Sequence, residues 1–195
     1  ARIEVANSLL FTLPGSPVVY YGDEIGMGDN IWMEDRDGVR TPMQWSDGRN
    51  AGFSSADPDD IYPPVIDDER YGYEQVNVAR QRDDPGSLLN WMRHAIEVRH
   101  EHPTLARGDL RFLDARTADG RAVDNAVLAY LRAHEGEHLL VVNNLSPEPR
   151  TVTLDLEGYA GAQPVDILHG EAAPAIGQDP YQLALARYGY RWLKL

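Results

Sequence analysis

The first residues of the chain place apolar side chains at helical spacing. Over residues 2–13 they recur every three or four positions, which is the period of one helix face. Further apolar residues lie beside that face, and a helix that is apolar over much of its surface needs partners on more than one side. We therefore expect a packed helix, and the chain reads as the tail of a larger protein. The residues on the face are Ile3, Ala6, Leu10 and Leu13.

A break and a short apolar run follow this helix. Residues 14–17, Pro-Gly-Ser-Pro, end the helix because proline cannot continue it. Residues 18–21, Val-Val-Tyr-Tyr, form a continuous apolar run that is typical of a buried parallel strand. A helix, a tight break and a buried strand together make one unit of an alternating α/β fold.

Two more helices are expected before residue 102. The first covers residues 74–83 and ends at the sequence Asp84-Pro85-Gly86. The second covers residues 88–101, and Ser87 is positioned to cap its first turn. Helical spacing defines one face of this second helix, on which lie Leu88, Met92, Ala95, Ile96 and Arg99.

From about residue 108 the apolar period changes from helical to two, which indicates strands. Six or seven short strands separated by Gly, Pro, Asn and Asp favour an antiparallel β-sandwich. We place the boundary near residue 103, so that residues 1–103 form an α/β region and residues 104–195 an all-β domain. The expected strands are residues 110–113, 127–131, 139–144, 151–156, 165–168, 181–185 and 190–195.

Residues 35–54 follow neither period, so we expect them to form a long loop. Pro42 restricts the backbone, while Trp45 and Phe53 supply apolar mass that a merely solvated loop would not carry. An ordered loop of this length inside a compact domain is usually functional. Trp32, Trp45 and Phe53 are candidates for the mouth of a pocket, although we expect Trp45 and Phe53 to be buried by packing.

Composition narrows the class of protein. The chain has 195 residues, of which 43% are hydrophobic and 25% charged, as in ordinary globular domains. A formal net charge of −13 argues against nucleic acid or an anionic membrane as a partner, because both require a basic surface. No apolar run reaches the length of a membrane span. The chain has no cysteine, so disulfides and thiolate chemistry are excluded and a cytoplasmic location is expected.

An acidic stretch at residues 57–69 is the one candidate for metal binding. Calcium takes several oxygen ligands, and six carboxylates lie here among three prolines. Their spacing lacks the central glycine and the terminal glutamate of an EF-hand. Charge runs are usually solvent-facing, so we expect a solvated loop and no metal site.

Three stretches resemble a known family. Residues 40–45, Arg-Thr-Pro-Met-Gln-Trp, and residues 50–54, Asn-Ala-Gly-Phe-Ser, are similar to the loop after the eighth strand in alpha-glucosidase-like members of the alpha-amylase superfamily. Residues 14–27 resemble the eighth strand of that family and its exit. The sequences Asp-Gly-Val-Arg at 37–40 and Tyr-Gly-Tyr-Glu-Gln-Val-Asn-Val at 71–78 narrow the resemblance to the trehalose synthases, which interconvert maltose and trehalose.

The resemblance implies a fold and a division of labour. The first helix and strand would be the seventh helix and eighth strand of a (β/α)8 TIM barrel, followed by the β-sandwich. The family takes its catalytic carboxylates from the fourth, fifth and seventh strands, which have no counterpart here. The resemblance therefore implies no catalytic residue in this chain, a structural role for Asp23 and Glu24, and no cofactor, with any structural calcium lying upstream.

For Arg40 the resemblance implies substrate binding. In the family this arginine lies at the bottom of the glucose pocket, pairs with an early-loop aspartate and contacts the non-reducing end of the sugar. The alternative is an arginine that holds its own loop through an ion pair. A guanidinium suits the binding role because its planar fork bridges carboxylate and hydroxyl groups.

Substrates and competing functions follow from the same resemblance. The expected ligands are the disaccharides maltose and trehalose, and we expect the complete enzyme to be a homo-oligomer. Two alternatives stay open. One is an alpha-glucosidase that hydrolyses alpha-glucosides, since the two activities differ in how well the pocket excludes water. The other is a non-catalytic carbohydrate-binding or assembly module in which only the β domain is used.

Overall fold

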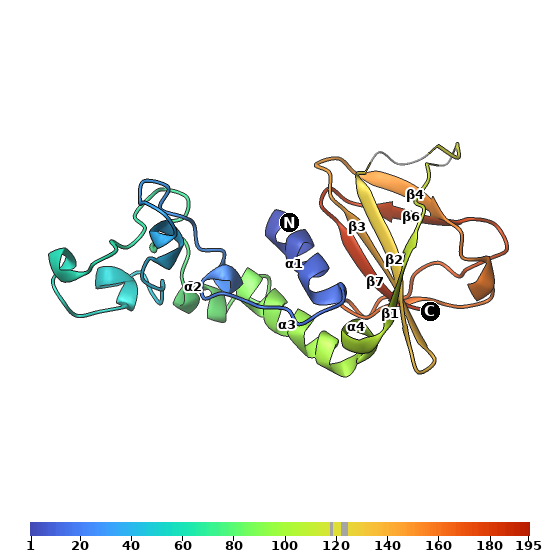
Figure 1. Cartoon of the computed structure of the whole chain (residues 1–195), viewed down its shortest axis with the longest axis horizontal. Helices are drawn as coiled ribbons and strands as arrows, with labels where there is room; N and C mark the ends of the chain where they lie inside the picture. The colour runs from blue at the N-terminus through green and yellow to red at the C-terminus, as the bar shows by residue number, and fades with distance from the viewer. Residues whose placement is uncertain (118, 122–124) are drawn as a thin grey trace. The chain divides into compact units, whose positions relative to one another are not determined.

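The computed structural model describes residues 1–117, 119–121 and 125–195, and these residues form two compact units (Figure 1). The first unit joins residues 1–17 to residues 94–195, and the second contains residues 18–93. Helix α3 (Leu88–Glu101) contributes residues to both units. The boundary predicted near residue 103, between an α/β region and an all-β domain, stays a prediction.

Two antiparallel sheets make up most of the first unit. The larger sheet has the strand order β1-β2-β3-β7-β5, and the smaller one pairs β4 with β6. All pairings are antiparallel, which confirms the predicted β-sandwich. The strands are β1 (Asp109–Leu113), β2 (Val127–His134), β3 (Glu137–Asn144), β4 (Arg150–Leu154), β5 (Val165–Asp166), β6 (Tyr181–Leu185) and β7 (Tyr190–Lys194).

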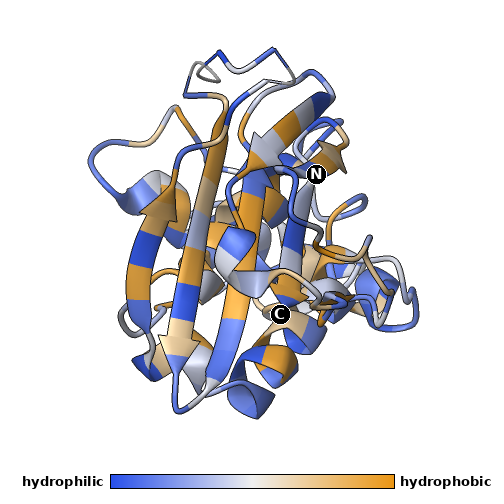
Figure 2. Ribbon diagram, turned by 90° about the vertical axis from the view of Figure 1, so that its right-hand side faces the viewer, coloured by the Kyte–Doolittle hydropathy of each residue, from blue (hydrophilic) through white to orange (hydrophobic). Residues whose placement is uncertain are grey.

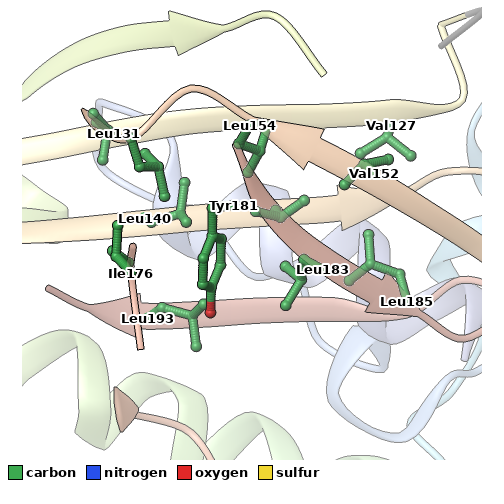
Figure 3. Packing of buried hydrophobic residues seen from close by; sticks show 13 residues of the cluster. Val127, Leu131, Leu140, Val152, Leu154, Ile176, Tyr181, Leu183, Leu185 and Leu193 are labelled. Atoms are coloured by element: carbon green, nitrogen blue, oxygen red, sulfur yellow. The ribbon is translucent and has the colours of Figure 1, made fainter. Parts of the chain in front are cut away.

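The core of the sandwich arises from the alternation of side chains along the strands. Apolar and polar bands alternate along several strands in Figure 2, and β6 alternates strictly between buried and exposed residues. In β2 and β3 the buried run is almost continuous, so both faces of these strands are covered. The cluster between the sheets includes Leu131, Leu140, Leu154, Leu183 and Leu193 (Figure 3).

Helix α1 (Arg2–Thr12) covers the other face of the large sheet and is joined to it by buried hydrogen bonds. The Ser8 hydroxyl donates to Asn143 Oδ1 at 2.6 Å and accepts from Trp192 Nε1 at 2.8 Å. The Thr12 hydroxyl shares a hydrogen bond with the Tyr130 hydroxyl, and burial raises the pKa of Tyr130 to about 12. The helix predicted for residues 2–13 is therefore present and packed.

Two buried arginines bind the end of α1. Arg132 of β2 is fully buried and donates to the carbonyls of Thr12, Leu105 (2.8 Å) and Gly108 (2.7 Å). Arg99 of α3 is 8% exposed. Its carbonyl partners are those of Phe11, Leu105 (3.0 Å) and Gly15 (2.9 Å). Burial lowers the pKa of both guanidinium groups, and neither forms an ion pair with a carboxylate in the described part of the chain.

Their partners are instead carbonyls at and near the ends of α1 and of α4 (Thr104–Arg107). The last carbonyls of a helix have no intrahelical donor and carry the negative end of the helix dipole. A positive charge with several donors therefore suits this position.

We predict that replacing Arg132 with methionine will destabilise the first unit strongly. Arg132→Met keeps most of the buried volume but leaves three buried carbonyls without this donor, at a cost of about 3–5 kcal/mol. Thermal unfolding followed by circular dichroism should show a melting temperature lower by about 6–20 °C. Arg107→Met, at an exposed position in α4, is the matched control. Equal melting temperatures for the two variants would contradict this account.

Glu137, at the start of β3, links three elements. Its Oε1 atom accepts from His102 Nδ1 at 2.8 Å and lies 3.0 Å from Lys194 Nζ. Partial burial would raise the pKa of Glu137, but hydrogen bonds from Thr104, His102 and Lys194 outweigh it and lower the pKa to about 2. The carboxylate thus connects the residues after α3 to β3 and β7.

This low pKa predicts how stability depends on pH. Glu137 binds its proton less readily in the folded chain than at the ordinary pKa of 4.5, so its contribution is complete above about pH 4.5 and is lost as the pH falls towards 2. Glu137→Gln should lower the unfolding free energy at pH 7 by about 1–3 kcal/mol. The difference from wild type should shrink below pH 4.5 in denaturant titrations. Glu148→Gln serves as the control, and a difference that is constant from pH 7 to pH 2.5 would contradict the assignment.

The second unit has little regular structure. It contains α2 (Val78–Arg82), the first part of α3 and four short 3₁₀ turns, η1 (Asp23–Ile25), η2 (Asp37–Arg40), η3 (Arg49–Gly52) and η4 (Pro58–Asp60). These elements surround a small core that includes Ile25, Met43, Val78 and Leu89. No helix in the described ranges is both long enough and apolar enough to span a lipid bilayer.

Local signals explain which helix predictions were right. Helix α3 spans the predicted residues, and the Ser87 hydroxyl accepts from the backbone N–H of Asn90 at 3.2 Å, as expected of a cap. The helix predicted at residues 74–83 is shorter, because Asn77 caps it by accepting from the Arg80 N–H at 2.7 Å. Helix α2 therefore begins at Val78.

The strand predicted at residues 18–21 is wrong. These residues are not in a strand, and Val18 is 80% exposed. A strand is defined by its pairing, and no described segment lies beside these residues to pair with them. An apolar run indicates what a segment can bury but does not supply the neighbour that buries it.

Candidate functional site

The loop at residues 35–54 is held in shape by its own backbone. Asn50 and Ala51 adopt left-handed conformations, with φ of 54° and 58°. This geometry lets the Ala51 carbonyl accept from the N–H groups of both Trp45 (2.9 Å) and Ser46 (3.0 Å). The Asn50 amide also donates to the carbonyls of Ser54 and Ala56. A left-handed alanine costs roughly 1 kcal/mol or more, so the surrounding contacts must impose this conformation.

Gln44 anchors the same loop to the segment before α2. Its side chain is fully buried, and Nε2 donates to the carbonyls of Tyr71 (3.1 Å) and Val76. The backbone carbonyl of Gln44 accepts from the N–H of Val78 at 3.0 Å. Sequence reasoning did not single out Gln44. The available signal was a long polar residue between two apolar ones, Met43 and Trp45.

A hollow of about 360 Å³ opens beside this loop. Its lining is mainly apolar, with Arg40 and Glu24 as the charged exceptions. Trp45 and Phe53 are 49% and 51% exposed, so the expectation that packing buries them is wrong. Their rings belong to the wall of the hollow rather than to the core of the unit. The lining residues are Tyr21, Glu24, Arg40, Thr41, Pro42, Met43, Trp45, Phe53 and Pro63.

Arg40 is the one predicted site residue, and it lies at this hollow. Its side chain is 50% exposed, and Nη1 is 3.6 Å from Asp37 Oδ1. An exposed pair of this length contributes little stability, so the guanidinium keeps donors for another partner. Trp32, the other aromatic candidate, is 88% exposed and does not line the hollow.

Asp23 and Glu24 bind backbone groups close to them in sequence. Asp23 Oδ2 accepts from the N–H of Tyr20 at 2.9 Å, and Glu24 Oε2 accepts from the N–H of Gly22 at 2.7 Å. These bonds shape the turn that follows residues 18–21. They give both carboxylates the local structural role that the resemblance implies.

The acidic stretch also uses its carboxylates locally. Asp68 accepts from the N–H groups of Tyr71 (2.6 Å) and Arg70 (2.7 Å), and these bonds lower its pKa. Asp57 pairs with Arg49. Across the described ranges, no three His, Cys, Asp or Glu side chains are grouped so that they could hold a metal ion.

Comparison with known proteins extends these observations. Residues 1–108 match the family model of the alpha amylase catalytic domain, and residues 121–192 match that of the maltogenic amylase C-terminal domain. The match confirms the predicted fold class, the end of a TIM barrel followed by a β domain.

Individual relatives are more specific. The trehalose synthase of Pimelobacter is 46% identical over the whole chain, which spans about a third (33%) of that protein. A glucan 1,6-alpha-glucosidase of Streptococcus pneumoniae is 31% identical over 75% of the chain and 31% of its own length.

Solved structures agree with this assignment. The trehalulose synthase MutB of Pseudomonas mesoacidophila aligns with 99% of the chain, and 38% of MutB is covered. The TM-score is 0.76 and the sequence identity 27%. The model of the alpha amylase catalytic domain alone matches more than half of the residues of this chain, and the chain therefore belongs to the alpha-amylase family.

Proposed function

We propose that this chain is the carboxyl-terminal part of a trehalose synthase, which interconverts maltose and trehalose by intramolecular glucosyl transfer. The observation that carries the proposal is the difference in similarity between two kinds of relative. Identity to the trehalose synthase of Pimelobacter is 46% over the whole chain, against 31% over three quarters of it for the glucosidase. The substrates on this proposal are the two disaccharides.

The chain's share of the work is recognition rather than bond cleavage. By resemblance, the nucleophile, the acid/base and the stabilising carboxylate come from earlier strands of the barrel. Asp23 and Glu24 bind their own turn, which supports a structural role for them. Retaining glycoside chemistry needs two carboxyl groups that face each other across the scissile bond, and adjacent residues of one turn do not supply that geometry.

Arg40 is the residue proposed to touch substrate. Its half-exposed guanidinium lies beside an apolar hollow, and within the described part of the chain it has a single long ion pair, to Asp37. Several N–H donors remain for sugar hydroxyls and for a carboxylate from another loop. The bent loop backbone and the Gln44 anchor hold the segment around Arg40, so the donors are positioned before substrate arrives.

The apolar wall of the hollow has a second use. Isomerisation requires that the freed glucose turn and rejoin the enzyme-bound glucosyl group before water attacks. Trp45 and Phe53 present half-exposed rings to the hollow, and apolar rings bind the C–H faces of a sugar while holding few waters. The second candidate function, hydrolysis of alpha-glucosides, needs the same recognition but a wetter pocket. A cytoplasmic location and a homo-oligomeric enzyme belong to the same proposal.

A chimera tests the proposed activity. The corresponding third of the Pimelobacter trehalose synthase would be replaced by this chain, with the unmodified relative as control. The chimera should convert maltose to trehalose and back, with little free glucose, because the remaining barrel supplies the carboxylates. The isolated chain should convert neither sugar. A folded chimera that releases glucose from maltose and forms no trehalose would favour the glucosidase alternative.

The same chimera tests Arg40. Arg40→Ala should lower kcat/KM for maltose and for trehalose together, since both present the same non-reducing glucose. Loss of a charged donor costs about 1.5–3 kcal/mol, or roughly a tenfold to more than hundredfold loss of kcat/KM. Arg40→Lys should recover little, because one ammonium does not reproduce the fork. Arg36→Ala, on the exposed part of the loop, is the control. Normal kcat/KM with a lowered melting temperature would show that Arg40 only holds its loop.

A further inference from the structure

A larger hollow lies within the first unit. Its volume is about 860 Å³, within the range of about 300–1,000 Å³ that is typical of small-molecule sites. It is bordered by residues 111–114, 116, 117 and 120, at and after the end of β1, by the segment that runs from β4 to Tyr159, and by the start of β6. None of these segments belongs to the hollow beside Arg40.

Backbone bonds fix the frame of this hollow. The segment after β1 crosses to the smaller sheet, where Arg116 and Thr153 exchange two hydrogen bonds of 3.0 Å and 2.7 Å. The Thr153 hydroxyl also donates to the carbonyl of Arg116 at 3.3 Å. Backbone hydrogen bonds therefore join the segment after β1 to β4 at one margin of the hollow.

One aromatic ring in the wall is held rigidly. The Tyr159 hydroxyl forms a 2.8 Å hydrogen bond with His138 Nδ1, and the two rings meet edge to face at 5.4 Å. Tyr159 is only partly buried and packs on the sandwich core. Phe112 also borders the hollow, but its ring contacts Tyr130, which faces α1, so we do not count that ring as part of the site.

The polar groups around the hollow have hydrogen-bonding capacity to spare. Five polar side chains of the lining form no hydrogen bond or ion pair with any other described residue. Together they offer guanidinium and amide donors beside carboxylate and amide acceptors, which is the mixture that sugar hydroxyls require. The five are Arg111, Asp114, Glu157, Asp179 and Gln182.

The charges select among ligand classes. Four carboxylates line the hollow against two guanidinium groups, which disfavours a phosphate or another anion. No three carboxylate or histidine side chains of the described ranges are grouped to hold a metal ion. A neutral ligand with many hydroxyl groups and a partly apolar face remains.

We propose that this hollow binds a neutral oligosaccharide of alpha-linked glucose, at a site separate from the one that holds Arg40. The choice of sugar rests on the proposed function, whereas the hollow and its unpaired polar groups are observed in the structure independently of that function. The hollow's volume is more than twice that of the hollow at Arg40, so it can admit several sugar rings. The β domain would thus keep a glucan close to the enzyme.

Titration of the 195-residue chain with maltotriose, followed by NMR chemical-shift changes, tests this site. We expect saturable binding with a Kd of about 1 mM, which is ordinary for a small, partly exposed ligand site. Shifts should appear around Tyr159 and Gln182. Asp179→Ala and Arg111→Ala should each raise Kd about fivefold or more, through the loss of a hydrogen bond to the sugar. Both positions are exposed, so the fold should be unaffected.

Two controls separate this site from the proposed catalytic one. Glu148→Gln, at an exposed position outside the hollow, should leave Kd unchanged. Arg40→Ala should also leave it unchanged, because Arg40 belongs to the other unit. Absence of saturation at about 50 mM maltotriose, or equal Kd values for wild type and Asp179→Ala, would overturn the inference. Binding lost in Arg40→Ala and kept in Asp179→Ala would overturn it too, while supporting the role of Arg40.

Discussion

The first unit depends on two buried guanidinium groups whose hydrogen-bond partners are backbone carbonyls rather than carboxylates. Arg99 and Arg132 come from a helix and a strand, and both direct their donors at carbonyls near the ends of α1 and α4. Removing a guanidinium from water is costly, and it is tolerated where several acceptors replace the lost hydration. Here the acceptors are groups that helix ends leave unpaired in any case. One pair of side chains thus satisfies two helix ends and attaches both to the sheet.

The Glu137 cluster also attaches elements to the large sheet, but through a partly buried negative charge that is surrounded by donors. It joins the chain after α3 to β3 and β7 through a carboxylate with a histidine, a lysine and a hydroxyl around it. This joint weakens when its carboxylate is protonated, whereas the arginine–carbonyl joint contains no acidic group. The unit therefore has one attachment that responds to acid and one that does not.

Much of this architecture could be predicted from local patterns. Each strand predicted in the β domain overlaps an observed strand. Helix α3 begins after its Ser87 cap and buries Met92, Ala95 and Arg99 of its predicted face, but Ile96 of that face is 37% exposed. The same face included Arg99, whose burial confirms that the pattern was meaningful even at a charged residue. The loop of Arg40 was identified through its resemblance to a family, because nothing in its periodicity points to a site.

The remaining features depend on partners that are distant in sequence. Residues 18–21 have a strand's composition without a strand's neighbour. Gln44 and Arg132 are polar residues whose burial makes sense only once the carbonyls around them have been placed by the fold. Trp45 and Phe53 are hydrophobic, yet they border a hollow rather than fill a core. Composition indicates whether a side chain favours burial, and the topology of the fold determines whether a partner is present to bury it.

The attachment of α1 has a consequence for how the protein is made. The polar partners of this helix include Trp192 and Tyr190 of the last strand, about 184–186 residues away from Ser8 and Glu4. Because α1 precedes β7 along the chain, these hydrogen bonds cannot form until the sandwich has been translated as far as β7. Formation of β7 then completes the sheet and the docking surface for α1 together. Translation speed and chaperone contact over the β domain thus help to determine when α1 reaches its native attachment.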